Sequence, residues 1–466
     1  MSEQLFKLGF SNLDLEQNAV PLKTQGRIPY WLNGTLFRNG PAKFSADENA
    51  GWHTHWFDGL AMLHKFSFCE GNVILYSNRY LRSNAYYSTL EKGQFNIGFG
   101  SKGGTSIKYA NNTNINVAIL DDRFVALTEN PGIMEFNPVN LETVDVFNFD
   151  DSLGGQLTTA HPHYDLQTGR YINFTTEFGR AHAYNVYSVA PHSRKRDLIA
   201  SVPTDRPAYM HSFANTENYV VITEFPLVID PRDLANEHKT LIENFTWKPD
   251  HGTLFRVVRK SDGVILKTFE AEAFFSFHHV NAFEIDGGLV LDICALKDDN
   301  MVNHLHVSNL KGNTGEPIFV QLRRYTVKFD SRNVSYEAIS PESIELPTIN
   351  YARSSGKSYR YAYGISTNKE HYENYPNQLA KADVQNGTTT IWRQDGCYPG
   401  EPIFVQRPNA NDEDDGVVLS VILDGRNSHS FLLVLDAQTF EELGRADVIH
   451  HIPFGFHGMF TGEQYM

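Results

Sequence analysis

The stretch GVVLSVILD (416–424), followed after a short turn by SFLLVLDA (430–437), shows most clearly how this chain folds. Both runs are rich in β-branched and other apolar residues and are bounded by turn residues, which is the pattern of short β-strands. The chain is therefore predicted to be all-β. Six further stretches have the same character: GNVILYSNRYL (71–81), RFVALTE (123–129), NYVVITEF (218–225), TLFRVVRK (253–260), GGLVLDICAL (287–296) and FVQLRRYTVKF (319–329).

The number of strands and the chain length together favour a β-propeller. Many short, regularly spaced strands are typical of a sandwich, a barrel or a propeller, and 466 residues favour several four-stranded blades. The sequence has no 40–50-residue repeat of the WD or kelch kind, so the blades must have diverged. Because no Pro/Ser-rich linker divides the chain, residues 1–466 are predicted to form a single domain.

Four local patterns predict structure between the strands. KSDGVIL (260–266) places Asp-Gly between two strands, which indicates a hairpin. RDLANEHKTLIENF (232–245), preceded by Pro231, is the best candidate for a helix. NANDEDDG (409–416) is predicted to be a solvated acidic loop. GFGSKGGTS (98–106) lacks the G-K-[ST] ending of a phosphate-binding loop and is predicted to be a flexible loop.

Composition excludes several classes of function. The formal net charge of −15 would repel phosphate backbones and anionic lipids, so nucleic-acid binding is not expected. Three distant cysteines without C-x-x-C spacing argue for a reducing compartment. The N-terminal residues lack a signal-peptide core, and no run of about 18 apolar residues occurs. A cytoplasmic protein is therefore expected.

Four histidines stand among aromatic, small or proline residues rather than among charges. They are His161 in TTAHPHYD, His211 in YMHSFANTENY, His278 in FSFHHVNAFE and His457 in IPFGFHGMF. Most histidines in a protein are surface or hydrogen-bonded core residues, and that interpretation stays open for each one. These four are too far apart for a local zinc motif, but the inner strands of successive blades could bring them to one axis. Four neutral imidazoles suit Fe(II), Zn or Cu.

Two further features bear on such a site. Because neighbouring side chains of a strand point to opposite faces, at most one of His278 and His279 can face it. Histidine ligands usually donate their other ring N–H to a carboxylate or carbonyl group. Glu129, Glu345 and Glu401 stand at strand ends beside proline and aromatic residues, although an exposed glutamate is the alternative for each.

These segments, taken together and in order, resemble those of the carotenoid cleavage oxygenases, in their animal-type branch. That branch contains the carotene oxygenases and the retinal-pigment isomerohydrolase. The resemblance runs nearly end to end and indicates a soluble member of bacterial type. It rests on GTLFRNGPAKF (34–44), HWFDGLAMLHKFSF (55–68), SNRYLRSNAY (77–86), NNTNINV (111–117), TENP (128–131), TAHPHYD (159–165), YMHSFANTENYVVITEFPL (209–227), FTWKPDHGTLFRVVRK (245–260), FHHVNAFE (277–284), ELPTINYARSSGKSYRYAYG (345–364), CYPGEPIFV (397–405) and IPFGFHG (452–458).

The resemblance implies a seven-bladed β-propeller with a loop and helix cap over the metal face. It implies one Fe(II) per chain, held by His161, His211, His278 and His457. The F-H-x-x-N motif selects His278 as the ligand, so that His279 faces away into strand packing or a backbone hydrogen bond. The family's three orienting glutamates match Glu129, Glu345 and Glu401, paired with His211, His278 and His457 respectively. His161 would have no carboxylate partner.

The family's chemistry implies a non-haem Fe(II) dioxygenase that cleaves a C=C bond of a carotenoid or apocarotenoid with O2. The implied products are carbonyl compounds, such as apocarotenals or retinal. No protein residue is assigned as a catalytic acid or base. Ile115 in NTNIN aligns with the apolar or Thr side chain beside the open iron position. The expected partners are an apolar polyene and O2, and the oligomeric state is unassigned.

Three other functions are weighed against this one. Stilbene-cleaving relatives carry a Lys where this chain has Thr128, which argues against a stilbene substrate. A non-oxidative retinoid ester isomerohydrolase needs an ester that is delivered from a membrane. The charged stretch 232–245 and the loop 91–108, which has no Cys, argue against stable anchoring of this protein to a membrane. Transient membrane contact through Phe95, Ile97 and Phe99 stays open. A propeller that serves only as a binding scaffold would hold no iron.

Overall fold

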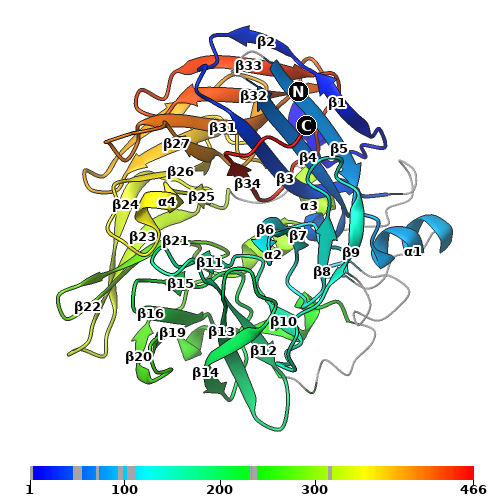
Figure 1. The fold of residues 1–466 in the computed structure, drawn as a ribbon. Helices are drawn as coiled ribbons and strands as arrows, with labels where there is room; N and C mark the ends of the chain where they lie inside the picture. The colour runs from blue at the N-terminus through cyan, green and yellow to red at the C-terminus, as the bar shows by residue number, and fades with distance from the viewer. Residues whose placement is uncertain are drawn as a thin grey trace.

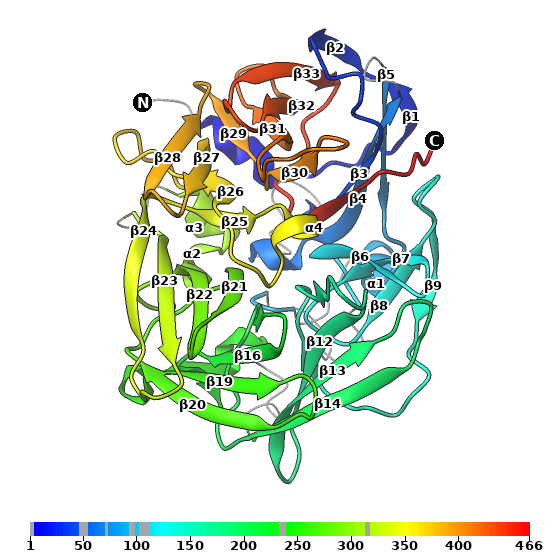
Figure 2. The ribbon, with the colours of Figure 1, turned by 60° about the vertical axis from the view of Figure 1, so that its left-hand side comes forward.

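Antiparallel sheets arranged around one axis make up the structure, a computed structural model that describes residues 4–45, 55–69, 73–92, 98–101, 111–230, 232, 239–312 and 317–466. Seven sheets of four to six strands form the blades within these residues, and they surround the axis in Figure 2. The predicted seven-bladed β-propeller is thereby confirmed. The strands β17 (Leu227–Ile229) and β18 (Phe245–Trp247) form a separate two-stranded sheet, which is not part of any blade.

The first four blades follow one another along the chain from blue to green in Figure 1. Their strands, in sheet order, are β1 (Gln17–Pro21), β5 (Val73–Tyr80), β4 (Leu60–Cys69), β3 (Gly34–Lys43) and β34 (Gly458–Thr461); β6 (Asn116–Leu120), β7 (Arg123–Leu127), β8 (Ile133–Phe136) and β9 (Thr143–Phe147); β10 (Leu157–Thr158), with β11 (His163–Tyr164) beside it, β12 (Tyr171–Glu177), β13 (His182–Val189) and β14 (Arg196–Thr204); and β15 (Ala214–Asn215), β16 (Tyr219–Glu224), β19 (Thr253–Arg259) and β20 (Ile265–Ala271).

The last three blades complete the ring. Their strands are β21 (His279–Ile285), β22 (Gly288–Ala295), β23 (Gln321–Lys328) and β24 (Ser335–Ser343); β25 (Glu345–Thr348), β26 (Tyr361–Ser366), β27 (Gln378–Asp383) and β28 (Thr388–Trp392); and β2 (Lys23–Gly26), β33 (Glu442–Val448), β32 (His429–Asp436), β31 (Gly416–Asp424) and β29 (Cys397–Pro399), with β30 (Ile403–Gln406) also on β31.

The two ends of the chain close the ring by strand pairing. The N-terminal strand β2 pairs with β33, with Lys23 opposite Asp447, and the C-terminal strand β34 pairs with β3, with Thr35 opposite Thr461. Each of these two blades therefore contains strands from both ends of the sequence. Such closure satisfies backbone groups that would otherwise form exposed sheet edges.

Strands packed between neighbouring blades are buried on both faces, which explains their nearly continuous apolar sequences. In β31 only Val421 is even partly exposed, and β22 is buried along its whole length. Each of the eight stretches that were predicted as strands coincides with an observed strand, to within a few residues at the ends. The hairpin predicted at 260–266 joins β19 to β20, and Gly263 takes the positive φ of 70° that its turn requires.

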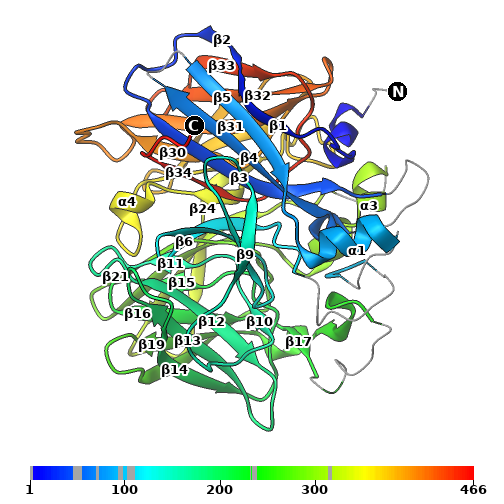
Figure 3. The same ribbon diagram turned by 45° about the vertical axis from the view of Figure 1, so that its right-hand side comes forward.

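Short helices lie on both sides of the ring. In Figure 3, α1 (Asn84–Lys92) and α3 (Val307–Lys311) lie to one side of the blades, and α4 (Tyr351–Ser354) lies on the opposite side. The 3-10 helices η1 (Leu5–Phe10) and η2 (Trp56–Asp58) pack together through Phe10 and Trp56, whose ring centroids are 5.8 Å apart. The helix α2 (Asn300–His304) precedes α3 directly, and η6 (Pro249–His251) precedes β19.

Some local predictions need correction. Residues 233–238 of the 232–245 stretch lie outside the described residues, and its described end forms the 3-10 helix η5 (Ile242–Asn244) and the start of β18 rather than an α-helix. The acidic loop 409–416 is not wholly solvated, because Asp414 is buried and its Oδ2 lies 2.6 Å from Lys381 Nζ. A buried ammonium group needs such a counter-charge.

The possible membrane-contacting residues are also only partly described. Phe99 is buried, with its ring centroid 5.1 Å from that of Phe57, so it offers no docking surface. Phe95 and Ile97 lie outside the described residues, as does most of the glycine-rich loop 98–106. Among the described helices, none has the length and apolar character needed to cross a bilayer.

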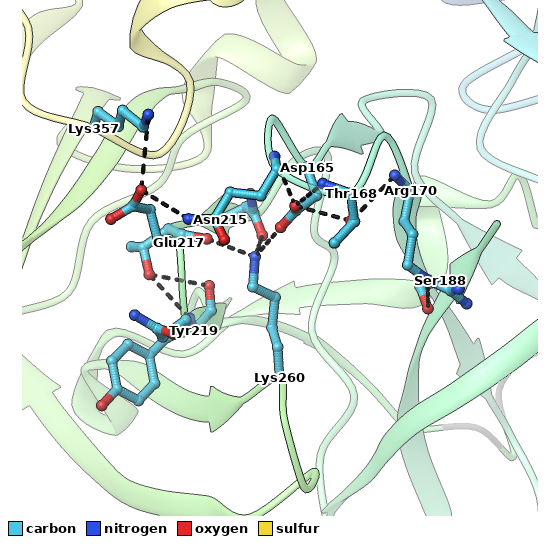
Figure 4. A network of polar contacts seen from close by, with 12 residues as sticks. Asp165, Thr168, Arg170, Ser188, Asn215, Glu217, Tyr219, Lys260 and Lys357 are labelled. Atoms are coloured by element: carbon cyan, nitrogen blue, oxygen red, sulfur yellow. Dashed lines mark hydrogen bonds and ion pairs between the residues drawn. The ribbon is translucent and has the colours of Figure 1, made fainter. Parts of the chain in front are cut away.

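A polar network links successive blades at their rims (Figure 4). Lys260 Nζ lies 2.7 Å from Asp165 Oδ2 and 2.7 Å from the carbonyl oxygen of Thr216, and its side chain is 12% exposed. Burial opposes ionisation of Asp165, but its hydrogen bonds to Lys260 and Thr168 hold the pKa of this carboxyl below its ordinary value. The network thus fixes the loop after β11 against the loop after β15.

Candidate metal centre

Four histidines from different parts of the chain meet at the propeller axis. His211, His278 and His457 stand just before the short inner strands β15, β21 and β34, and His161 lies between β10 and β11. Each offers one ring nitrogen, and these four nitrogens lie within 4.8 Å of one another. The structure therefore brings together all four histidines that the sequence pointed to.

Carboxylates hold three of the four rings in place. The Nδ1 atoms of His211, His278 and His457 lie 2.6, 2.5 and 2.6 Å from oxygens of Glu129, Glu345 and Glu401, in that order. These are the pairs that the resemblance implied. No carboxylate partner occurs for His161 within the described part of the chain.

These hydrogen bonds decide which nitrogens face the centre. A carboxylate accepts, so each Nδ1 carries the proton and each Nε2 points a lone pair inward. The Nε2 atoms of His278 and His457 are only 3.3 Å apart, and His161 Nε2 is buried with no hydrogen-bond partner among the residues that the structure describes. Converging lone pairs repel one another unless a cation lies between them, so this donor set fits a divalent transition metal.

The surroundings keep His161 and His457 neutral and Glu345 ionised. Burial, reinforced by the neighbouring histidines, holds the pKa of His161 well below its ordinary value. Burial likewise lowers the pKa of His457 to about 4, although Glu401 opposes the shift. Burial favours protonation of Glu345, but His278 and the Leu346 backbone N–H outweigh it and lower the pKa of this carboxyl.

Two further side chains, which were not among the predicted site residues, reach the carboxylates. Arg38 forms a buried ion pair with Glu401 and donates from Nη2 to the carbonyl oxygen of Phe456 at 2.7 Å. The Tyr209 hydroxyl donates to Glu129 Oε1 at 2.8 Å. Each had a sequence signal, because Arg38 is a lone charge in the apolar GTLFRNG and Tyr209 stands two residues before His211.

His278 and His279 point in opposite directions, as strand geometry requires. The ring of His279 lies between two hydroxyl groups, with Nδ1 2.8 Å from Ser212 Oγ and Nε2 2.9 Å from Thr223 Oγ1. It therefore takes part in strand packing, and its partners are side-chain hydroxyls rather than a backbone group. Asn281 of the same motif donates to the carbonyl oxygen of Ser354 at 2.9 Å and so holds α4.

An apolar channel leads to the histidines. Its wall includes three of the four (His211, His278 and His457), together with Ile115, Phe57 and Phe456. The backbone carbonyl of Ile115 accepts a hydrogen bond from the His457 N–H at 3.1 Å, which places Ile115 beside the centre. Thr128 lies instead in the wall of a separate, more polar cavity.

Comparison with known proteins agrees with this geometry. The family model described as retinal pigment epithelial membrane protein matches residues 10–462. The chain is 32% identical to the β,β-carotene 15,15′-dioxygenase of Gallus gallus, over 97% of this chain and 98% of that protein. It is also 32% identical to the mitochondrial carotenoid-cleaving dioxygenase of Homo sapiens, over 95% of this chain and 88% of that protein.

Solved structures with the same fold come from an apocarotenoid oxygenase of Synechocystis. A glutamate-to-glutamine variant of that enzyme has a TM-score of 0.89 and 25% identity, over 98% of both chains. Its cobalt-substituted form has a TM-score of 0.87 and 25% identity over the same share of each chain. The chain therefore belongs to the retinal pigment epithelial membrane protein family, which is the family of the carotenoid-cleaving dioxygenases.

Proposed function

We propose that this protein is a non-haem Fe(II) dioxygenase that cleaves a C=C bond of a carotenoid or apocarotenoid. The observation that carries the proposal is the set of four converging imidazoles, three of them held by carboxylates, at one side of an apolar channel. Imidazole nitrogens suit iron among the transition metals. The dioxygenase relatives favour this oxidative reaction over ester isomerohydrolysis.

His161, His211, His278 and His457 would hold one iron ion through their Nε2 atoms. Glu129, Glu345 and Glu401 fix the ring orientations and the tautomers, as outer partners of histidine ligands do. When bound, the iron would supply the activation of O2. In the overall reaction the C=C bond and the O–O bond break, and each alkene carbon leaves as a carbonyl group with one oxygen atom.

The rest of the site would position an apolar polyene and exclude water. Phe57 packs against the ring of His211 at a centroid distance of 5.8 Å, and Phe456 packs against Phe57. Ile115 is buried beside His457 and would restrict one approach to the metal. No proton transfer is needed in the balanced reaction, so no residue is assigned as an acid or base.

The test is a cleavage assay on protein purified from iron-replete cells. Detergent-solubilised β-carotene and a set of apocarotenals are incubated with the protein, with and without O2, and the products are identified by chromatography and mass spectrometry. The proposal predicts aldehyde products only when both iron and O2 are present. Product formation from a retinoid ester without O2, or no turnover of any polyene by iron-loaded protein, would contradict it.

A further inference from the structure

The three glutamates behind the histidines differ in their second partners. Glu401 forms an ion pair with the guanidinium group of Arg38. Glu129 accepts a hydrogen bond from the neutral Tyr209 hydroxyl at 2.8 Å, and Glu345 has only a backbone N–H besides its histidine. Within the described part of the chain, Arg38 is therefore the one Lys or Arg that pairs with a glutamate of this site.

Arg38 is buried in β3, directly beside the strand that follows the ligand His457. Its backbone pairs with that of Gly458, and its Nη2 donates to the carbonyl oxygen of Phe456 at 2.7 Å. The residue is only 6% exposed. A buried guanidinium group loses much of its hydration, so its position needs a compensating interaction.

Holding a carboxylate in place does not by itself require a cation. The Tyr209 hydroxyl gives Glu129 a hydrogen bond without adding charge, and a backbone N–H does the same for Glu345 at 2.7 Å. Arg38 differs from these donors because it adds one permanent positive charge behind Glu401. The effect of that charge on the metal centre is therefore separate from its hydrogen bonds.

The charge of Arg38 balances the buried site when the metal is divalent. The carboxylates of Glu129, Glu345 and Glu401 carry three negative charges, and the four histidines are neutral when they bind a metal. A divalent ion and Arg38 together carry three positive charges. A trivalent ion would leave one positive charge unbalanced, and an unbalanced charge is costly where water is excluded.

We propose that Arg38 is a positioning residue whose positive charge makes the histidine centre favour Fe(II) over Fe(III). It acts through Glu401, whose other oxygen lies 2.6 Å from His457 Nδ1, so one carboxylate and one imidazole ring separate the guanidinium group from the centre. The identity of the metal as iron rests on the proposed function, whereas the positive charge behind Glu401 is argued from the ion pair.

The expected size follows from Coulomb's law. At an effective dielectric constant of about 20, one unit charge at about 10 Å changes an equilibrium that adds one charge by about tenfold. Replacing Arg38 by methionine should therefore increase the ratio of Fe(III) to Fe(II) at a fixed potential by about tenfold. For a one-electron couple, this corresponds to a midpoint potential lower by about 59 mV.

The test is a redox titration of the iron-loaded protein, so it does not depend on turnover. Wild type and variants are loaded with Fe(II) under argon and oxidised stepwise through soluble mediators, which accept the electron. The ferric fraction is read from its electron paramagnetic resonance signal. Arg38→Met should show the tenfold increase, and Arg38→Lys, which keeps the charge, should remain close to wild type.

Glu401→Gln tests the same charge from the opposite side and does not depend on whether Arg38→Met folds. It removes one negative charge, so the ratio of Fe(III) to Fe(II) should decrease by about tenfold at the same potential. Unchanged ratios in Arg38→Met and Glu401→Gln would overturn the proposal. A shift in Arg38→Lys as large as in Arg38→Met would also overturn it, because the orientation of Glu401 and not the charge would then be responsible.

Arg196→Met is the matched control. The Arg196 side chain is 9% exposed, against 8% for Arg38, and it pairs with Asp151 at 2.7 Å on the outer strand β14. This variant should lower Tm without changing the ratio of Fe(III) to Fe(II). Iron-loaded wild type that shows the predicted shifts in its variants but cleaves no polyene would refute the proposed reaction and leave the role of Arg38 standing.

Discussion

Replacing each of two adjacent histidines by alanine separates the metal site from the strand that carries it. His278 directs Nε2 toward the centre, 3.3 Å from His457 Nε2, whereas His279 is held between Ser212 and Thr223 on the other face. The two substitutions remove the same ring from neighbouring positions. We therefore expect His278→Ala to lose iron and activity, and His279→Ala to lose stability.

The size of each effect follows from the contacts. His279→Ala deletes two hydrogen bonds to buried or half-buried hydroxyls, at about 1 kcal/mol net each, and some ring packing. The expected loss is about 2–3 kcal/mol of unfolding free energy, a decrease of a few degrees in Tm. His278→Ala removes a proposed iron ligand, so the expected loss of metal affinity exceeds the 10–100-fold loss typical of an outer partner.

The assay combines three measurements on the same preparations of wild type and both variants. Iron per folded chain is determined by mass spectrometry, stability by thermal unfolding, and activity by product formation from β-carotene. His279→Ala should keep its iron and most of its activity per folded chain, and His278→Ala should lose both by about 100-fold or more. Equal losses of iron in the two variants would refute the assignment of His278.

Other perturbations test the partners and the scaffold. Glu345→Gln should weaken iron binding about 10–100-fold in a competition with a chelator, because the His278 ring loses its anionic acceptor; unchanged affinity would contradict this role. His64 is buried with a pKa near 3 in the folded protein, so the unfolded chain binds its proton first as pH falls below about 6.5. The unfolding free energy should therefore decrease as pH is lowered from about 6.5 towards 3. In urea unfolding, His64→Gln should reduce the dependence of the unfolding free energy on pH by about 1.4 kcal/mol per pH unit. An unchanged dependence would contradict this role of His64. Lys260→Met leaves Asp165 partly buried without its cation and should cost about 3 kcal/mol. The double variant with Asp165→Asn should lose less than the sum of the single losses, and strict additivity would rule out the coupling.

Local sequence predicted the strands because their burial is reflected in local composition. Stretches such as 416–424 and 430–437 are packed between blades, so their apolar character is nearly continuous. The pairing of β2 with β33 and of β3 with β34 leaves no such local trace. It joins residues more than 400 positions apart, and only the ring geometry specifies it.

Short helices and loops were predicted least well. The helices α2 and α3 contain five residues each, too few to show a helical period. The acidic loop 409–416 looked solvated because its composition is charged, yet Asp414 is buried by a contact with Lys381. That contact is a tertiary property that composition cannot reveal.

For the candidate site, the resemblance located the four histidines and three glutamates, and strand alternation separated His278 from His279. The contacts of Arg38 with Glu401 and of Tyr209 with Glu129 were not predicted, because they join residues that only the folded chain brings together.

The iron content of the purified protein tests the central claim most directly. Wild-type protein from iron-replete cells, passed through a desalting column and analysed for transition metals, should contain about one iron per chain, because four converging Nε2 atoms need a cation between them. Less than about a tenth of an iron per chain would contradict the assigned metal centre and the oxygenase that depends on it.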